Sequence, residues 1–321
     1  MKIWNKFKNF FILLRTFIID IKEFSFSVAI GRLVRDLPFM SWDRRRTFYE
    51  QRICKYLKRK YTGFIYKCLE NYDKTKSKRQ NERYIWVMWW QGEDSMPPIV
   101  KACFSQLNSV ANSCKVVLLT KDNLDCYISL PQHVIKKFES GKIQNANFSD
   151  IIRCCLLNKY GGVWLDATVW ADRIPEEMFD IDFYTLSAPG MFPEFINRGR
   201  ISTFVLASKY TNAQFFYLLE TLLTKYWEEH SKAIDYLYFN FFIELVFYTL
   251  PELRKSFYVM SENRDFYWLN LNINKEYVKD EFMQMMEKSP LQKVTYRKEL
   301  ILETDNRLTN YGYITKKGGI F

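Results

Sequence analysis

Histidine is scarce in this chain, and its scarcity disfavours several kinds of catalysis. Only two histidines occur, His133 and His230. Neither has a Ser-His-Asp or Cys-His pattern around it, and neither falls in a metal-ligand spacing, so we expect both to be structural or surface residues. The 11 glycines form neither a P-loop nor a dinucleotide fingerprint. A hydrolase triad, a histidine-based metal site and a Rossmann dehydrogenase are therefore disfavoured.

Paired cysteine motifs and long apolar runs are also missing. The seven cysteines include no CxxC pair, so no disulfide framework or zinc site is predicted, and free thiols fit a reducing cytoplasm. The apolar N-terminal run is interrupted by Arg15, Asp20 and Lys22. It falls short of the roughly 18 uninterrupted apolar residues of a membrane-spanning helix, and no small-residue cleavage site follows it. We therefore expect a cytoplasmic protein.

Positive charge is abundant, and it leaves three classes of partner open. The formal net charge is +11, and the basic residues concentrate near the N-terminus. Nucleic acid, an anionic membrane surface or a phosphorylated substrate would each suit that charge. The aromatic residues, 18% of the chain, lie in apolar runs instead of alternating with basic residues. We therefore expect no nucleic-acid partner.

The first 80 residues read as a helical region. Residues 1–24 predict an amphipathic helix, because large apolar side chains recur at steps of three and four. Two interpretations remain open for this helix: it lies in a membrane interface, or it packs on the protein's own core. Residues 25–72 look mainly helical, and 74–83 look like a solvated linker. The apolar stripe consists of Ile3, Phe7, Phe10, Phe11, Leu14, Phe17, Ile18 and Ile21.

Strands and helices alternate after residue 83. The predicted order is strand 84–90, helix 98–107, strand 115–120 and helix 131–140. This alternation predicts an α/β fold with a parallel sheet and helices on its faces. Ligands of such sheets bind beyond the carboxyl ends of the strands. The turns Gln91–Asp94 and Lys121–Asn123 are therefore candidates for the binding site.

Residues 147–172 form the most informative segment, which reads as helix, turn and strand. Ser149 is a predicted N-cap, and Asp150 and Arg153 are three residues apart and share one face of the helix. Because the helix is apolar nearly all round, these two residues should be partly enclosed. A Gly-Gly turn leads into a strand predicted over 163–170, which carries Asp166. A carboxylate there needs a cation or hydrogen-bond donors.

These motifs resemble a known family. Ser149-Asp150-x-x-Arg153, followed by Gly161-Gly162-x-Trp164-Leu165-Asp166, resembles the capsular polysaccharide synthesis family of glycosyltransferases. That family is related to DxD-containing sugar transferases such as fungal mannosyltransferases and clostridial glucosylating toxins. Weaker matches extend the resemblance to roughly residues 83–300. They are Ile85-Trp86, Trp89 to Gly92, Pro97-Pro98, Phe204 to Lys209, Tyr226-Trp227, Asp235-Tyr236 and Lys293 to Tyr296.

The resemblance implies a GT-A-like domain with a mixed, mostly parallel sheet, here behind an N-terminal helical extension. We expect the helical region at 1–80 and the transferase domain at 81–321. Its donor half would span about 81–185 and its acceptor half about 186–300. The resemblance also implies a nucleotide-sugar donor, most simply a UDP-sugar, and a lipid-linked or oligosaccharide acceptor.

Site residues follow from the same resemblance. Trp86 would stack on the base, Asp150 and Arg153 would contact the donor sugar, and Asp166 would contact the ribose and a metal-bound diphosphate. Further predicted donor contacts are Gln91, Ser149, Gly162 and Thr168. Predicted acceptor contacts are Asp235 and Tyr236, although Asp235 reads equally well as a carboxylate on a helix surface.

One departure from the related pattern bears on the cofactor. Where the wider group has DxD, this chain has Asp166-Ala167-Thr168, and threonine is a poor ligand for a hard divalent cation. We expect Mn²⁺ or Mg²⁺ bound through Asp166, with further ligands from Asp172, Asp305 or Asn306. The alternative is that basic side chains neutralise the diphosphate without metal.

The expected function is therefore that of a hexosyltransferase in capsular or cell-surface polysaccharide synthesis, acting with retention. It would work in the cytoplasm, peripherally at the inner face of the cell membrane. Two alternatives remain: an inactive scaffold in a polysaccharide assembly complex, and a toxin-like transferase with a protein acceptor. The missing second carboxylate of DxD keeps the scaffold open.

Overall fold

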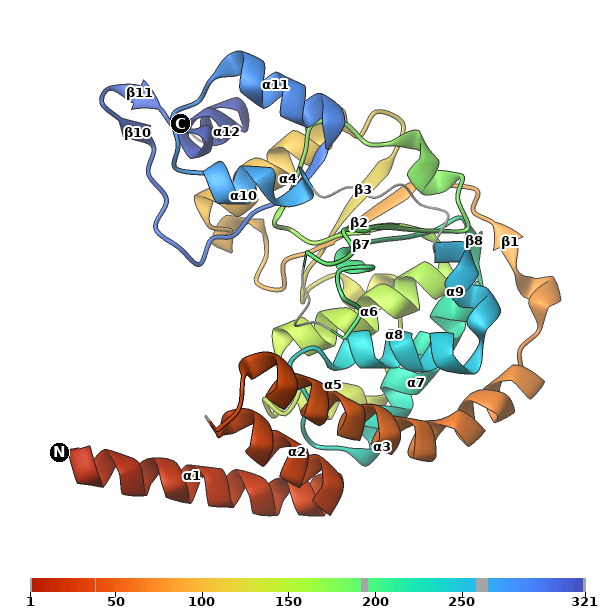
Figure 1. Cartoon of the computed structure of the whole chain (residues 1–321). Coiled ribbons are helices and arrows are strands. Elements are labelled where there is room, and N and C mark those ends of the chain that lie inside the picture. Colours follow the sequence, from red (N-terminus) through yellow and green to blue (C-terminus); the bar gives the residue numbers. More distant parts are fainter. Residues whose placement is uncertain (1, 38, 192–195, 258–264, 320–321) are drawn as a thin grey trace.

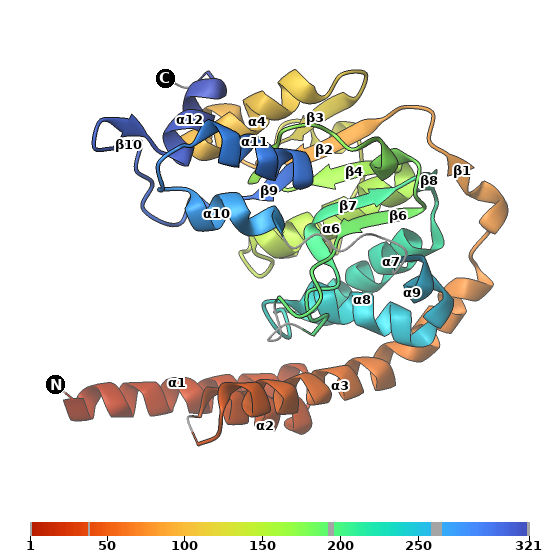
Figure 2. The ribbon, with the colours of Figure 1, turned by 45° about the horizontal axis from the view of Figure 1, so that its top comes forward.

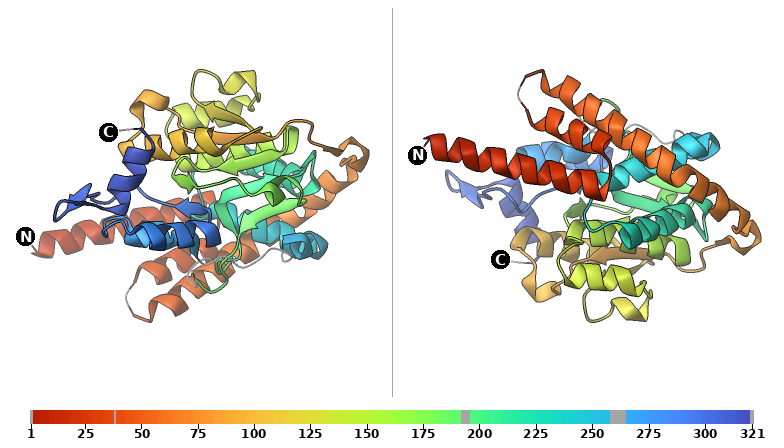
Figure 3. Two further views of the ribbon diagram at one scale, coloured as in Figure 1. Left: turned by 90° about the horizontal axis from the view of Figure 1, so that it is seen from above. Right: turned by 90° about the horizontal axis from the view of Figure 1, so that it is seen from below.

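Three N-terminal helices lie along one side of an α/β domain in the computed structural model (Figures 1 and 2). The structure describes residues 2–37, 39–191, 196–257 and 265–319, and the backbone alone for residues 2–10 and 257. The helices are α1 (Lys2–Glu23), α2 (Phe26–Asp36) and α3 (Trp42–Glu70). Seen from below in Figure 3, they cross the molecule, and the start of α1 extends away from the sheet.

The predicted helical region is confirmed, and specific contacts hold its helices. The hydroxyl of Ser25 caps α2 by accepting a hydrogen bond from the Val28 amide at 3.2 Å. Asp20 of α1 is fully buried, where it pairs with Arg32 of α2 at 2.5 Å and with Lys232 at 2.8 Å. Helix α3 buries an apolar stripe at helical spacing against α2, α7 and α8. Its members are Tyr49, Ile53, Leu57, Tyr61 and Ile65.

A five-stranded sheet of order β3-β2-β4-β7-β6 forms the centre of the α/β domain. Strands β3, β2 and β4 pair in parallel, whereas β7 is antiparallel to both β4 and β6. Four of the five strands therefore run the same way, which confirms the mixed, mostly parallel sheet. The strands are β2 (Tyr84–Met88), β3 (Lys115–Leu119), β4 (Gly162–Leu165), β6 (Phe183–Leu186) and β7 (Ser202–Ser208).

The two faces of this sheet are covered by different helices. Alternate residues point to opposite faces of a strand, so Trp86 and Trp164 face one core while Ile85 and Val163 face the other. The first core is closed by α3 and by α5 (Gln132–Glu139), α6 (Asn145–Lys159), α7 (Gln214–Glu229) and α8 (Tyr238–Thr249). The second is closed by α4 (Pro98–Val110), α10 (Trp268–Asn272), α11 (Lys279–Lys288) and α12 (Asn310–Lys317).

Smaller elements connect and extend this framework. Helix α9 (Pro251–Phe257) follows α8, and short 3-10 helices occur at Lys74–Lys76, Glu93–Ser95, Leu124–Cys126, Glu176–Phe179 and Asp265–Tyr267. The described residues also form three two-stranded sheets. They pair β1 (Lys78–Arg79) with β8 (Tyr210–Thr211), β5 (Val169–Ala171) with β9 (Leu291–Lys293), and β10 (Glu303–Thr304) with β11 (Arg307–Leu308).

The single strand predicted over 163–170 is wrong. Strand β4 ends at Leu165, and the chain turns over Asp166, whose carbonyl accepts a hydrogen bond from the Val169 amide at 2.9 Å. The chain continues as β5 in a different sheet, paired with β9. This turn places Asp166 at the carboxyl end of β4, the end at which ligands of such sheets bind.

The Gly-Gly turn before β4 requires both of its glycines. Gly161 and Gly162 have φ of +68° and +87°, values that residues with a side chain rarely adopt. A Cβ atom on Gly162 would lie 2.6 Å from the carbonyl oxygen of Tyr84. Gly162 lies at the opposite end of β4 from Asp166. The structure therefore places it away from the predicted donor contacts, and its role here is to bring β4 against β2.

Candidate active site

A cavity of about 660 Å³ opens beyond the carboxyl ends of β2 and β4. This volume lies within the range of ordinary ligand pockets. Its walls come from the ends of these two strands, the first turns of α6, the start of α8 and the segment after β9. Of the two predicted binding turns, the first lines the cavity through Gln91, whereas residues 121–123 do not line it.

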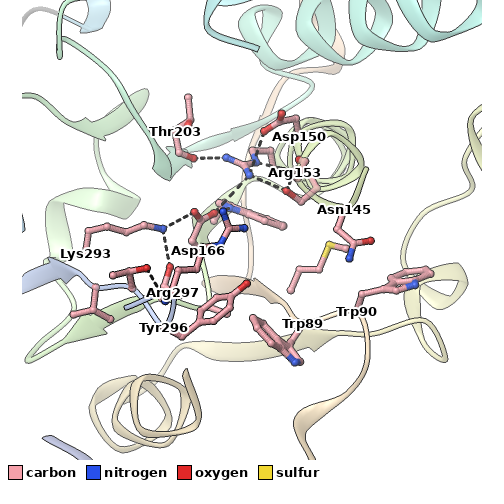
Figure 4. A pocket seen from close by; sticks show the side chains of 18 of the residues that line it. Trp89, Trp90, Asn145, Asp150, Arg153, Asp166, Thr203, Lys293, Tyr296 and Arg297 are labelled. Atoms are coloured by element: carbon pink, nitrogen blue, oxygen red, sulfur yellow. Dashed lines mark hydrogen bonds and ion pairs between the residues drawn. The ribbon is translucent and has the colours of Figure 1, made fainter. Parts of the chain in front are cut away.

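Helix α6 brings Asp150 and Arg153 to the cavity wall, as their spacing predicts. Arg153 Nη2 lies 3.3 Å from Asp150 Oδ1 and 3.5 Å from Asp166 Oδ1 (Figure 4). The same guanidinium donates to the carbonyl of Thr203 and to Ser149 Oγ. Only 6% of the Arg153 side chain is exposed. Because the protein occupies its donors, Arg153 is arranged to fix the two carboxylates in place.

Ser149 is not the N-cap of its helix, so this prediction is wrong. Helix α6 begins at Asn145, four residues earlier, so Ser149 lies inside the helix. Its hydroxyl donates to the carbonyl of Ala146 at 2.8 Å and accepts from Arg153 Nη2 at 3.0 Å. Phe148 of the first turn is buried against Phe138 of α5 and Trp90, and this tertiary packing overrides the local capping preference of serine. Ser149 still lines the cavity.

Asp166 is held by two side-chain hydrogen-bond donors and by the nearby cation Arg153, and it stays ionised. Trp164 Nε1 donates to its Oδ1 at 3.0 Å, and Lys293 Nζ donates to its Oδ2 at 2.8 Å. Burial by itself would raise the pKa of Asp166, but the cations Lys293 and Arg153 outweigh burial and lower the pKa to about 2. The side chain keeps 29% of its surface exposed.

Asp150 is in a different electrostatic state from Asp166. Burial raises the pKa of Asp150 to about 7, although Arg153 lowers it and Asp166 adds a smaller increase. The two carboxylates therefore differ by about five pKa units within one cavity. Such a separation is typical of sites in which two acidic groups have different tasks.

Aromatic side chains form the opposite wall of the cavity. Trp89 follows β2 directly and contacts Tyr296 edge to face, with ring centroids 5.7 Å apart (Figure 4). Its indole N–H donates to Ser95 Oγ at 2.9 Å. Trp90 and Tyr236 also line the cavity, and Tyr236 is 71% exposed. These rings provide flat apolar surfaces beside the charged wall.

Trp86, predicted to stack on a base, does not line the cavity. Its side chain is fully buried, its indole N–H donates to the carbonyl of Gly161 at 3.0 Å, and its ring stacks on Tyr84 at 4.6 Å. A ring enclosed in this way presents no face to a ligand. Trp89 is the aromatic residue at the carboxyl end of the same strand, the position that the general rule for such sheets singles out.

Asp235, predicted to contact the acceptor, does not line the cavity either. It is buried, and its carboxylate accepts from Arg46 of α3 at 3.0 Å and pairs with Arg35 at 3.4 Å. It also accepts from the Leu237 amide at 2.9 Å. These contacts join the N-terminal helices to the loop before α8, so Asp235 has a structural role. Its neighbour Tyr236 is the one of the predicted pair that lines the cavity.

A profile of the family described as Capsular polysaccharide synthesis protein matches residues 38–313. The chain belongs to this family. The matched range contains every residue that lines the cavity, and membership confirms the resemblance seen in the SDxxR and GGxWLD motifs.

Comparison with individual proteins shows only weak similarity. One solved chain, titled PaToxG Glycosyltransferase, is 13% identical and overlaps 75% of this chain and 100% of its own length. The TM-score of 0.41 is too low for the overlap to carry a functional assignment. No curated protein gives a significant match.

The side chains described around Asp166 form no cluster of protein ligands for a divalent metal. Within the described ranges, no group of three or more histidine, cysteine or acidic side chains could hold an ion. The extra ligands predicted from sequence lie elsewhere. Asp172 pairs with Lys317 at 3.5 Å outside the cavity wall, and Asp305 and Asn306 form the exposed turn between β10 and β11. Lys293 occupies the space between Asp166 and Thr168 in this family member.

Lys293 is the functional candidate that sequence reasoning left without a role. It appeared only as part of a weak C-terminal match, 127 residues from Asp166. The pairing of β5 with β9 sets Lys293 opposite Val169, just after the turn that carries Asp166 and Thr168. Spacing along the chain gives no sign of this pairing.

Proposed function

We propose that this chain is a glycosyltransferase that moves a sugar from a nucleotide-sugar donor, a UDP-sugar, to a growing capsular or cell-surface glycan. The observation that carries the proposal is the junction of Asp166 with Arg153 and Lys293 beside the aromatic wall of one cavity. Cations suit a diphosphate, carboxylates suit sugar hydroxyls and ribose, and a flat ring suits a base.

The proposed reaction breaks the bond between the anomeric carbon and the phosphate oxygen. Charge builds on the leaving diphosphate, so positioning and electrostatic stabilisation supply most of the rate. Asp150 accepts hydrogen bonds from hydroxyls of the donor sugar, and Asp166 accepts hydrogen bonds from the ribose. Arg153 holds both carboxylates in position. Trp89 stacks on the base in place of Trp86. Retention of configuration follows the family resemblance.

Transfer of radiolabelled sugar to endogenous acceptors tests this function. Purified protein is mixed with membranes and a panel of labelled UDP-, GDP- and CMP-sugars, and the label is followed into lipid-linked glycan and into protein. We expect label in lipid-linked glycan from one donor class. Label in protein alone would favour a toxin-like transferase. Donor binding without transfer to any acceptor would favour the inactive scaffold.

The pKa of Asp150 predicts a pH dependence. Donor turnover should rise with pH through about 7, because the ionised carboxylate is the better acceptor for sugar hydroxyls. Asp150→Asn should remove this inflection from the pH profile of kcat/KM. Tyr238 and Asp166 also face this carboxyl group, but neither titrates near pH 7, because burial raises the pKa of Tyr238 well above its usual value and the pKa of Asp166 is about 2.

Ionisation of Asp150 should lower the stability of the fold as pH rises, whereas it should raise donor turnover. The folded-state pKa of Asp150 lies above its unfolded value of about 3.9. The folded state therefore binds more protons between about pH 4 and 7, and this group makes stability fall as pH rises through that window. Urea unfolding of wild type and Asp150→Asn across the window measures the difference. An identical slope in the two proteins would contradict the raised pKa.

We also propose that α1 associates peripherally with an anionic membrane surface at the inner face of the cell membrane. Within the described residues, no helix combines the length and apolar character needed to cross a membrane. The predicted stripe is supported where side chains are described: Leu14, Ile18 and Ile21 are exposed, and Phe17 is half-buried. Ile3, Phe7 and Phe10 lie outside the described side chains. Basic Arg15 and Lys22 accompany the exposed residues, as in interfacial helices.

Vesicle sedimentation measures this association. Wild type should pellet with vesicles of anionic lipid and stay soluble with neutral ones. The triple variant Leu14→Ser, Ile18→Ser, Ile19→Ser should lose most of this binding, since it removes exposed apolar area and leaves the buried Asp20 pairs intact. Deletion of residues 1–24 should have the same effect. Equal binding of wild type and variant would rule out α1 as the anchor.

A further inference from the structure

We propose that the ammonium group of Lys293 takes the place of a divalent metal in this site, so that the donor diphosphate binds without Mn²⁺ or Mg²⁺. This inference rests on the proposed function. Lys293 Nζ donates to Asp166 Oδ2 at 2.8 Å and to Thr168 Oγ1 at 2.7 Å. It thereby bridges the first and third positions of the Asp-Ala-Thr sequence, the positions that carry the two carboxylates of a DxD pair.

The backbone fixes this ammonium before any ligand binds. Strands β5 and β9 pair so that Val169 lies opposite Lys293, and the Val294 amide donates to the carbonyl of Thr168 at 2.9 Å. The Lys293 side chain is 18% exposed and lies over the ring of Phe204 at 5.0 Å. An ammonium has three N–H donors, and two of them are used by Asp166 and Thr168. Within the described part of the chain the ammonium has no further acceptor, so the third N–H remains for an oxygen of the diphosphate.

The charges of the cavity fit a diphosphate and oppose a divalent ion. Among the residues that the structure describes, the charged side chains lining the cavity are three cations, Arg153, Lys293 and Arg297, and two carboxylates, Asp150 and Asp166. With both carboxylates ionised the sum is +3 − 2 = +1. A divalent ion beside Asp166 would have to displace the ammonium or lie next to it, and the second oxygen ligand would be the neutral hydroxyl of Thr168.

Lys293 would act on the leaving group during transfer. The bond between the anomeric carbon and the phosphate oxygen breaks, its electron pair stays on that oxygen, and the product is a nucleoside diphosphate. The glycan hydroxyl forms the new bond to the anomeric carbon and loses its proton to solvent water. Lys293 donates a hydrogen bond to the diphosphate and supplies positive charge there, the role that a metal ion would otherwise have.

Binding of UDP and GDP tests the inference directly. The protein is stripped with EDTA, and each nucleotide is titrated calorimetrically in EDTA and in Mn²⁺. We expect one of them to bind with a Kd that changes less than about twofold between the two conditions. Lys293→Met should weaken it roughly 10- to 100-fold, the usual range for one charge-assisted hydrogen bond. Lys288→Met is the matched control, because Lys288 pairs with Asp265 away from the cavity.

The outcomes of this titration distinguish the role of Lys293 from the proposed transferase function. Binding that requires Mn²⁺ would overturn the role of Lys293 and leave the transferase proposal standing. Equal affinity of folded Lys293→Met and wild type would also overturn it. If Lys293→Met does not fold, Thr168→Val removes one partner of the ammonium and should weaken nucleotide binding without creating a need for metal. Absence of binding to either nucleotide in both conditions would remove the proposed transfer from a nucleoside-diphosphate sugar.

Discussion

Replacing Asp166 by asparagine is expected to reduce donor turnover by roughly two to three orders of magnitude, the usual effect of removing one electrostatic group from a catalytic site. The carboxylate is the partner that Arg153 and Lys293 share, so its loss leaves two cations facing each other without compensation. It also removes the proposed acceptor for the ribose. Hydrolysis of the preferred nucleotide-sugar, followed as released nucleoside diphosphate, measures the change.

Asp166→Asn should also lower stability in a defined pH range. The folded-state pKa of about 2 lies below the unfolded value of about 3.9, so this carboxylate contributes stability above pH 4 and loses it as pH falls toward 2. Asp172→Asn is the control, since Asp172 contacts Lys317 outside the cavity and should keep wild-type turnover. A folded Asp166→Asn variant with wild-type turnover would show that Asp166 has no part in the reaction.

Arg153→Met is expected to have the largest effect on stability, a loss of about 3–5 kcal/mol in the free energy of unfolding. The guanidinium is almost fully buried and pairs with both Asp150 and Asp166. Its removal leaves the buried Asp150 carboxylate without its partner and the carbonyl of Thr203 without its donor. Urea denaturation at pH 8, where Asp150 is ionised in wild type, gives the value.

A double variant separates charge pairing from lost packing. Adding Asp150→Asn to Arg153→Met removes the unpaired carboxylate, so the double variant should be more stable than Arg153→Met alone. The coupling between the two sites follows from the full cycle of four proteins. Strictly additive effects would mean that Asp150 and Arg153 do not interact in solution.

Local parts of the site could be predicted from the sequence because short spacing determines them. Asp150 and Arg153 are three residues apart on one helix, so any helix there brings them to the same wall. The α/β alternation after residue 83 likewise depends on local apolar patterns, and the sheet confirms it. The GG turn predicted the start of β4 because positive φ at Gly162 leaves little choice of residue.

Long-range contacts account for what the sequence could not provide. Lys293 reaches Asp166 through the β5–β9 pair, and this pairing follows from packing across the domain. The alternation of residues 163–170 looked like one strand, yet the hydrogen bonds of Asp166 turn the chain into a second sheet. Trp86 and Trp89 are chemically alike, and only the depth of burial, set by neighbouring strands and helices, separates them.

The most direct test of the account is calorimetric titration of wild-type protein with UDP-, GDP- and CMP-sugars, repeated with Trp89→Ala. The account predicts that one class of nucleotide-sugar binds, and that Trp89→Ala weakens that binding by roughly 10-fold or more through loss of stacking on the base. Folded wild-type protein that binds none of these donors would contradict the assignment of the cavity as a nucleotide-sugar site.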